Sequence, residues 1–144
     1  MTESEKLKVL FLCTGNACRS QMAEGWANYL KSDSIVAFSA GTNPAGLSKR
    51  ATQVMAEAGV DISEHTSKYV DDLAGLDFDY VVTVCDNAKE QCPVFSGDAK
   101  MVHKSFDDPA GVIGTLDEVL GEFRRVRDEI KAFVETMPAS LENA

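Results

Sequence analysis

The sequence lacks long apolar runs, and it has few basic residues: 14 lysines and arginines against 23 aspartates and glutamates. No stretch approaches the roughly 20 apolar residues that a membrane-spanning helix needs, so no membrane partner is expected. The polar start MTESEKLK has no signal-peptide pattern, which favours a cytoplasmic location. A net charge of -9 disfavours nucleic-acid binding, because polyanions are bound by clusters of lysine and arginine. These absences still allow one small anion to be held in a local pocket.

Internal repeats, linkers and low-complexity tracts are also missing, so we interpret residues 1–144 as one domain with a polar tail from about residue 138. Four cysteines occur: Cys13, Cys18, Cys85 and Cys92. In a chain of this size without a secretion signal, reduced thiols, a metal or redox chemistry are better expectations than structural disulfides. The C-x6-C spacing is not a usual zinc pattern, so no metal site is predicted, and inert core thiols stay an alternative.

Short apolar runs alternate with amphipathic segments along the chain. Strands are predicted over 7–12, 34–41, 78–84 and, more weakly, 99–106; helices are predicted over about 20–31, 48–59 and 115–136. This alternation is typical of βαβ units. We therefore predict an α/β fold, a single domain with a four-stranded parallel sheet flanked by helices on both faces. In such a sheet, ligands bind outside the carboxyl ends of the strands.

The first predicted strand ends at a cysteine, and CTGNACRS connects it to the first helix. Glycine and asparagine tolerate left-handed backbone, so this loop can turn successive N–H groups inward around an anion, and Arg19 can donate to two of its oxygens. We predict that this positive environment lowers the pKa of Cys13 and makes it a nucleophile. The alternative is a Cys13 that only packs and an Arg19 that is only solvated. The predicted oxyanion-binding residues are Thr14, Gly15, Asn16, Ala17, Cys18, Arg19 and Ser20.

Later segments supply a candidate acid and two more thiols. Attack on an oxyanion needs a proton for the departing oxygen. The segment SFDDPAG contains two candidate donors, Asp107 and Asp108. The alternative is that this segment is only a turn. Cys85 ends the third predicted strand, which places it at the same sheet edge as Cys13, where its thiolate could attack an oxidised adduct. A bond from Cys85 to Cys92 requires the segment between them to loop out, because a disulfide needs Cα atoms within about 7 Å.

The segment VLFLCTGNACRSQMAEG resembles the low-molecular-weight phosphotyrosine phosphatase superfamily, and more closely its thioredoxin-coupled arsenate reductases. FSAGT, ISEHTSK, YVVTVCDNAKEQCP, FDDPAG and FRRVRDEI are similar to segments of those reductases in the same order, so the resemblance covers nearly the whole chain. It implies a low-molecular-weight-phosphatase-like fold and makes Asp108 the general acid. It also implies that Cys85 and Cys92 are resolving cysteines, which simple phosphatases lack.

The implied activity is reduction of arsenate to arsenite by Cys13, Cys85 and Cys92, with thioredoxin as electron donor and no bound cofactor. Phosphate or sulfate would compete as oxyanions, weak residual phosphatase activity is expected, and the protein is expected to be a monomer. The first alternative is a phosphatase acting on phosphotyrosine or another phosphomonoester; the second is a non-enzymatic redox or anion sensor. Ala110 and Gly111 disfavour phosphotyrosine, because tyrosine phosphatases of this kind usually carry an aromatic residue after the Asp-Pro pair.

One departure from these reductases lies around the loop. Some of them hold potassium through positions that match Asn16, Glu24, Ser39 and an acidic residue after HTS, but here Lys68 follows HTS. We predict that the Lys68 ammonium replaces the cation and pairs with Glu24, so that activity is insensitive to potassium; a solvated surface lysine is the alternative. Cys18 is expected to be structural, or to form an off-pathway disulfide under oxidation.

Overall fold

The computed structural model describes residues 6–73, 75–85 and 99–142. Four parallel strands form one sheet in the order β2-β1-β3-β4, with β1 at Leu7–Cys13, β2 at Ile35–Gly41, β3 at Tyr80–Thr83 and β4 at Lys100–His103. Residues 9–13 of β1 are all buried, because this strand pairs on both sides and is covered on both faces. The predicted four-stranded parallel sheet is therefore confirmed.

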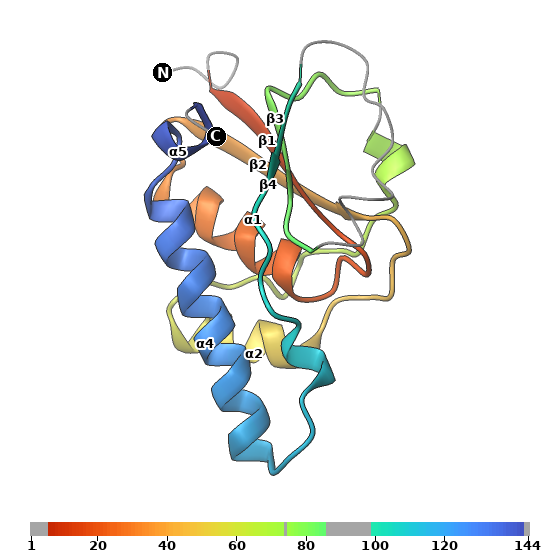
Figure 1. Ribbon diagram of the computed structural model, residues 1–144, viewed down its shortest axis with the longest axis vertical. Helices are drawn as coiled ribbons and strands as arrows, with labels where there is room; N and C mark the ends of the chain where they lie inside the picture. The colour runs from red at the N-terminus through yellow and green to blue at the C-terminus, as the bar shows by residue number, and fades with distance from the viewer. Residues whose placement is uncertain (1–5, 74, 86–98, 143–144) are drawn as a thin grey trace.

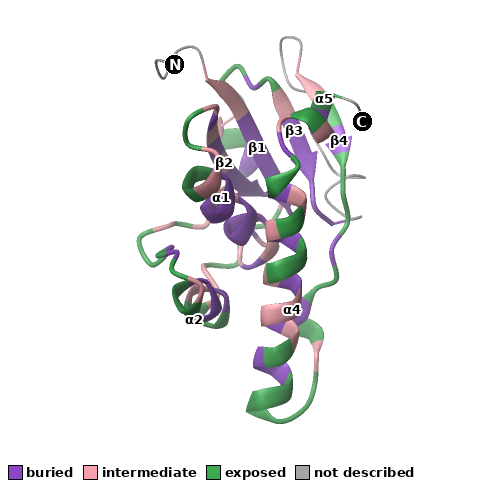
Figure 2. Ribbon diagram, turned by 90° about the vertical axis from the view of Figure 1, so that its left-hand side faces the viewer, coloured by how far each residue is buried: buried purple, intermediate pink, exposed green. Residues whose placement is uncertain are grey.

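Helical segments lie on both sides of the sheet, as predicted. Three helices pack together on one side: α1 (Arg19–Leu30), α2 (Lys49–Glu57) and α4 (Leu116–Glu135), whereas the single-turn 3-10 helix η2 (Val70–Leu73) lies on the other side (Figure 1). Another 3-10 helix, η3 (Pro109–Gly111), precedes α4. Figure 2 shows α1 buried over most of its length, while α2 and α4 keep exposed outer faces. Among the described helices, none has the length and apolar character needed to cross a membrane.

Local capping signals set the starts of α2 and α4. The Ser48 hydroxyl accepts from the Ala51 N–H at 3.1 Å, and Thr115 and Glu118 form a reciprocal capping box at 3.2 Å. Leu116, which is in phase with the apolar stripe of this helix, is 61% exposed. It lies in the first turn of α4, which extends beyond the other elements (Figure 1). The buried stripe of α4 consists of Val119, Leu120, Phe123, Val126, Ile130 and Val134.

The segment from residue 138, predicted to be a polar tail, differs from that description. Ala139–Glu142 form the short helix α5, in which the Leu141 side chain is fully buried. The carbonyl oxygen of Glu142 accepts a hydrogen bond from the Lys100 ammonium at 2.9 Å, so α5 is tied to the edge strand β4. The buried Leu141 side chain and the hydrogen bond from Lys100 together dock this segment on the rest of the domain.

The strand register brings the site residues to one edge of the sheet. Cys13, the last residue of β1, pairs with Gly41, the last residue of β2, and Thr83 at the end of β3 pairs with Leu12. The segments that follow these strands therefore start side by side. The segment after β4 lies beside these segments as well. Its Phe106 N–H donates to the carbonyl oxygen of Val84, the residue before Cys85.

Candidate active site

In the loop between β1 and α1, most backbone carbonyl oxygens accept hydrogen bonds from residues outside the loop. Segment 42–48, which follows β2, runs beside it, and its N–H groups donate to the carbonyl oxygens of residues 13, 14, 15 and 17 at 2.8–3.2 Å. The carbonyl oxygen of Asn16 accepts from the Gln21 amide at 3.1 Å. Within the part of the chain that the structure describes, the N–H groups of residues 15–19 have no acceptor. Since the carbonyl groups point outward, this arrangement is suited to an anion at the start of α1.

Asn16 supplies the left-handed residue of the loop, with a φ of 47°, whereas Gly15 does not adopt this conformation. The Asn16 side chain is fully buried, and its amide nitrogen donates to the Ser20 hydroxyl at 2.8 Å. Its side-chain oxygen accepts from the Lys68 N–H at 2.8 Å and from the Gln21 amide at 3.2 Å. Asparagine is one of the few residues other than glycine that visits this backbone region readily, which explains the residue type.

Gly41 is required by a close approach of the two strand ends. A Cβ atom on Gly41 would lie 2.5 Å from the Thr14 carbonyl oxygen and 3.0 Å from the Asn16 backbone nitrogen. Both of these atoms belong to the backbone of the loop, so neither can move without changing the loop itself. Glycine at this position therefore lets β2 end directly against the anion-binding loop.

Arg19 and Asp108 face one another across the open side of the loop. The Arg19 Nη1 atom donates to the Phe106 carbonyl oxygen at 3.1 Å, and Nη2 lies 3.7 Å from the Asp108 Oδ2 atom. The Arg19 side chain is 14% exposed and that of Asp108 is 53% exposed, so the carboxyl group lies nearer to solvent. Asp107, the other candidate acid, instead forms an ion pair with Arg125 of α4 at 3.1 Å. Only one of the two aspartates thus faces the loop arginine.

The second thiol lies beside the first. Cys85, two residues beyond the end of β3, is 5% exposed, and its thiol shares a hydrogen bond with the thiol of Cys13. The Thr14 hydroxyl lies 3.4 Å from the Cys85 sulfur. A cysteine from the first strand and one from the third are therefore neighbours at the same sheet edge, as the sequence predicted. Cys92 lies outside the described residues.

The prediction that the loop lowers the pKa of Cys13 is wrong for this thiol pair. The pKa of Cys13 is raised above its ordinary value, chiefly by the hydrogen bond with Cys85 and next by burial. The Arg19 guanidinium and the Thr14 N–H act in the opposite direction and lower it, but they do not prevail. The loop itself contains only these two lowering groups, whereas the opposing thiol follows a strand that is distant in sequence.

Cys18, the third described cysteine, packs inside the loop. Its side chain is 7% exposed, and burial raises the pKa of its thiol, while a hydrogen bond from Ser48 at the start of α2 lowers it. The structural role expected for Cys18 stays a prediction. Its backbone N–H belongs to the set at residues 15–19 that lacks an acceptor among the described residues.

The shell around the loop differs from the prediction in one contact. Glu24 accepts from the Ser39 hydroxyl at 2.5 Å and lies 3.6 Å from His65, and it does not pair with Lys68. The Lys68 ammonium instead donates to the Thr66 carbonyl oxygen at 2.7 Å. The predicted pairing of Lys68 with Glu24 is therefore absent from the structure.

Several residues of this shell were not identified from the sequence. Gln21 is fully buried, and its side chain joins Asn16 to the Thr66 carbonyl oxygen at 3.0 Å and to the His65 ring at 3.0 Å. The Ser67 hydroxyl donates to the Gly15 carbonyl oxygen at 3.0 Å. These contacts join segments more than 40 residues apart, and no local pattern in a single sequence reports them.

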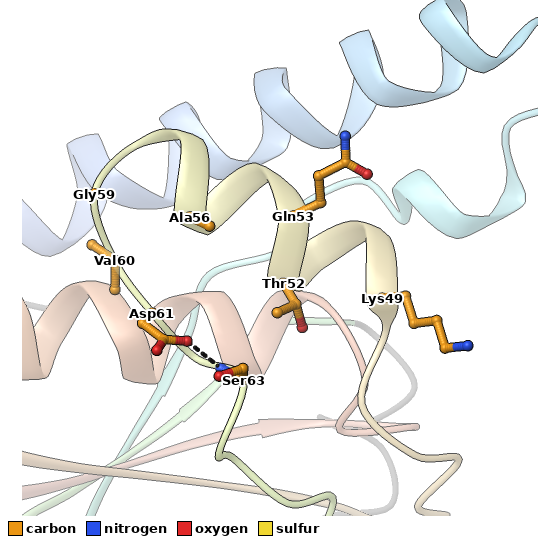
Figure 3. Close-up of a pocket in the computed structure, with 8 residues that line it drawn as sticks. All are labelled: Lys49, Thr52, Gln53, Ala56, Gly59, Val60, Asp61 and Ser63. Atoms are coloured by element: carbon orange, nitrogen blue, oxygen red, sulfur yellow. Dashed lines mark hydrogen bonds between the residues drawn. The ribbon is translucent and has the colours of Figure 1, made fainter.

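The described residues away from this edge of the sheet offer no metal site, and an open hollow lies beside α2. Among residues 6–73, 75–85 and 99–142, no cluster of histidine, cysteine, aspartate and glutamate could hold a metal ion. A hollow of about 660 Å³ lies between α2 and the segment after it, where the Asp61 carboxylate accepts from the Ser63 N–H at 2.8 Å (Figure 3). None of the predicted site residues lines it; its walls are Lys49, Thr52, Gln53, Ala56, Gly59, Val60, Asp61 and Ser63.

The fold and the site define a class of α/β protein that presents a cysteine, an arginine and a row of backbone N–H groups to a tetrahedral oxyanion. A family model, low molecular weight phosphotyrosine protein phosphatase, matches residues 8–144. A protein of Bacillus licheniformis named arsenate reductase is 47% identical over 135 residues, which cover 91% of this chain and 97% of that protein.

Solved structures show the same likeness. One described as an arsenate reductase in the phosphate binding state is 31% identical with a TM-score of 0.70, covering 93% of this chain and 98% of its own. A low molecular weight protein tyrosine phosphatase from T. tengcongensis is 26% identical with a TM-score of 0.71, covering 96% and 100%. The chain therefore belongs to the low molecular weight phosphotyrosine protein phosphatase family, and within it to the arsenate reductases, which confirms the resemblance seen in the sequence.

Proposed function

We propose that this protein reduces arsenate to arsenite by a relay of Cys13, Cys85 and Cys92, with thioredoxin as the electron donor. The observation that carries the proposal is the contact between the Cys13 and Cys85 thiols at the edge where the loop N–H groups and Arg19 lie. Hydrolysis of an ester needs only the first thiol, whereas a two-electron reduction needs a second one within reach. The relatives named arsenate reductases support the same substrate.

Arsenate binding and the first bond exchange use the loop. The oxyanion accepts hydrogen bonds from the N–H groups of residues 15–19 and from the Arg19 guanidinium. Because its pKa is raised, Cys13 starts as a thiol, and in this proposal it passes its proton to an oxygen of the bound arsenate. The sulfur then attacks arsenic, an S–As bond forms, and an As–O bond breaks. Asp108 gives its proton to the departing oxygen, which leaves as water.

The redox step transfers two electrons from sulfur to arsenic. The Cys85 thiol passes its proton to an oxygen of the arsenic adduct. The resulting thiolate, to which the Thr14 hydroxyl can donate a hydrogen bond, attacks the Cys13 sulfur, and an S–S bond forms. The S–As bond breaks with its electron pair on arsenic, so As(V) becomes As(III) and leaves as arsenite. Cys92 then attacks Cys85 and releases the Cys13 thiolate. A dithiol donor, thioredoxin, reduces the Cys85–Cys92 disulfide and completes the cycle.

The setting of this reaction is part of the proposal. We infer a monomer that works in the cytoplasm, where thioredoxin keeps thiols reduced. No bound cofactor is invoked, because three thiols and a thiol donor account for both electrons. Phosphate and sulfate, which share the tetrahedral geometry of arsenate, are expected to compete for the loop.

A second candidate function is hydrolysis of phosphotyrosine or another phosphomonoester. The facing pair of Arg19 and Asp108 beside a cysteine loop favours it, because the same groups can form and break a phosphoryl–sulfur bond. Weak activity of this kind is expected even in a reductase. The residues after Pro109, Ala110 and Gly111, offer no ring to stack on an aryl substrate, which disfavours phosphotyrosine as the main substrate.

One assay separates the two functions. NADPH oxidation is followed with arsenate, thioredoxin and thioredoxin reductase, and hydrolysis of p-nitrophenyl phosphate is measured on the same preparation. We expect arsenate-dependent NADPH oxidation to be the dominant activity. Phosphatase activity without arsenate-dependent NADPH oxidation would overturn the assignment.

A variant without the last thiol tests the relay. Cys92→Ser should release one arsenite per protein molecule and then stop, leaving a Cys13–Cys85 disulfide that mass spectrometry of the alkylated protein can locate. Cys85→Ser, the matched variant, should release no arsenite at all, because the S–As adduct cannot be resolved. Sustained thioredoxin-coupled turnover by Cys92→Ser would refute the proposed three-cysteine relay.

A further inference from the structure

The peptide group between Gly15 and Asn16 presents one of the N–H groups to which the oxyanion is assigned. Its carbonyl oxygen belongs to Gly15 and its N–H to Asn16, and the two point in opposite directions. A rotation of this peptide by about 180° needs changes only in ψ of Gly15 and φ of Asn16. After such a rotation, a carbonyl oxygen would face the oxyanion where an N–H group faces it now. The orientation of this single peptide therefore decides whether the loop attracts or repels an anion at that point.

The observed orientation places Asn16 in a sparsely populated region of the backbone map. Asn16 has a φ of 47°, which is disfavoured for residues other than glycine, and the rotation would take it to about -133°, an extended value that any residue adopts. Gly15 offers no steric resistance, because it has no side chain. Its nearest neighbour, the Ala45 side chain, would lie 3.5 Å from a Cβ atom placed there, which is an ordinary contact. Contacts from outside the loop therefore add to those of the Asn16 side chain in holding the observed orientation.

Two donors hold the Gly15 carbonyl oxygen on the outer side of the loop. The Ala45 N–H lies 2.9 Å from it and the Ser67 hydroxyl 3.0 Å from it. Gly15 is the one residue among 13–17 whose carbonyl oxygen receives both a backbone and a side-chain donor from distant segments of the described chain. The extra hydrogen bond is thus made to the peptide whose N–H belongs to the residue with the positive φ, Asn16.

The backbone on both sides of Ser67 is itself tied to the loop shell. The preceding residue, Thr66, offers its carbonyl oxygen to the Gln21 side chain at 3.0 Å. The following residue, Lys68, donates its N–H to the Asn16 side chain at 2.8 Å, and its carbonyl oxygen accepts from the Gly41 N–H at 2.8 Å. The Ser67 hydroxyl therefore reaches the carbonyl from a fixed position.

From this geometry we propose that Ser67 is a positioning residue for oxyanion binding, which holds the Gly15–Asn16 peptide with its N–H directed at the oxyanion. The proposal rests on the oxyanion-binding role proposed above for the loop, and it adds a residue outside the loop to that role. No bond is made or broken in this step; the hydroxyl acts only through the orientation of the peptide.

Phosphate binding to the reduced protein, measured by isothermal titration calorimetry, tests the proposal. Ser67→Ala should raise the phosphate dissociation constant about fivefold, which corresponds to about 1 kcal/mol, the net worth of one neutral hydrogen bond. Ser67→Thr keeps the hydroxyl and should stay within about twofold of the wild-type constant. Ser32→Ala removes an exposed hydroxyl at the opposite end of β2 and should leave the constant unchanged.

A spectroscopic readout separates positioning from a general loss of structure. In an NMR titration, phosphate should shift the backbone amide signal of Asn16 downfield in the wild-type protein, because that N–H donates to it. In Ser67→Ala the same signal should shift much less, while amide signals of α4 stay in place. If Ser67→Ala does not fold, Ser67→Cys, which is nearly the same size with a weaker donor, should weaken phosphate binding in the same direction.

Equal phosphate binding by Ser67→Ala and wild type, with an unchanged Asn16 shift, would overturn the role of Ser67. Equal weakening by Ser67→Ala and Ser67→Thr would also overturn it, because the hydroxyl would then not matter. These outcomes leave the proposed function standing. Failure of the wild-type protein to bind phosphate at all would instead refute the oxyanion-binding role of the loop.

Discussion

Replacing Gly41 with alanine is expected to damage the anion-binding loop from the neighbouring strand. The added Cβ atom would lie 2.5 Å from the Thr14 carbonyl oxygen, closer than real Cβ contacts, so one of the two backbones has to shift by roughly 0.5–1 Å. Overpacking of this kind costs about 1–3 kcal/mol. For 144 residues the unfolding entropy is about 0.3 kcal/mol per degree, so the melting temperature should fall by roughly 3–10 °C.

The assay combines thermal unfolding with phosphate titration of the same protein. Gly41→Ala should lower the melting temperature and also weaken phosphate binding, because the shifted Thr14 and Asn16 belong to the loop. Gly121→Ala is the matched control: Gly121 is exposed within α4, nothing lies within 4 Å of its added Cβ, and alanine should stabilise the helix by about 1 kcal/mol. A Gly41→Ala variant with wild-type stability and wild-type phosphate affinity would refute this reasoning.

Three further predictions concern the chemistry of the site. Cys85→Ala removes the largest cause of the raised pKa of Cys13, so the pH midpoint for Cys13 alkylation by iodoacetamide should move to lower pH; an unchanged or higher midpoint would contradict the assigned cause. Asp108→Asn removes the proposed proton donor and should lower the rate of arsenite release by about 100-fold or more, without weakening phosphate binding to Arg19. A rate within tenfold of wild type would exclude Asp108 as the acid. Exchanging potassium for sodium should leave kcat/KM for arsenate unchanged, because the Lys68 ammonium, 2.7 Å from the Thr66 carbonyl oxygen, already supplies a cation beside the loop shell. Several-fold activation by potassium would contradict this.

Much of the fold could be predicted because its signals are local. The apolar run of β1 and the periodic stripe of α4 each follow from side-chain spacing, and the capping box at Thr115 sets the start of α4. The errors are also local in origin. Leu116 satisfies the period yet lies in a turn that extends beyond the core, and Leu141 sits in a polar segment yet docks on it. Periodicity does not report where a neighbouring element ends.

Some features of the candidate site could likewise be predicted from the sequence, and others could not. Strand order and parallel direction place Cys85 near Cys13, so topology alone was enough to bring the two thiols to one edge. The choice between Asp107 and Asp108 came from the family resemblance, and the structure gives it a physical basis: one carboxylate faces Arg19 and the other pairs with Arg125. A turn of two adjacent aspartates contains no local information about which one points inward.

The sequence by itself determined the chemical groups: a cysteine at a strand end, a loop with an asparagine able to adopt a left-handed backbone, an arginine at a helix start and two later thiols. Only the tertiary structure decided how those groups behave. It brought in Cys85, which raises the pKa of Cys13 against the loop, and it turned the loop carbonyls outward by donors from segments 42–48 and 66–68. The physical reason is that hydrogen bonds and burial depend on atoms within a few ångströms, and those atoms come from parts of the chain that are distant in sequence.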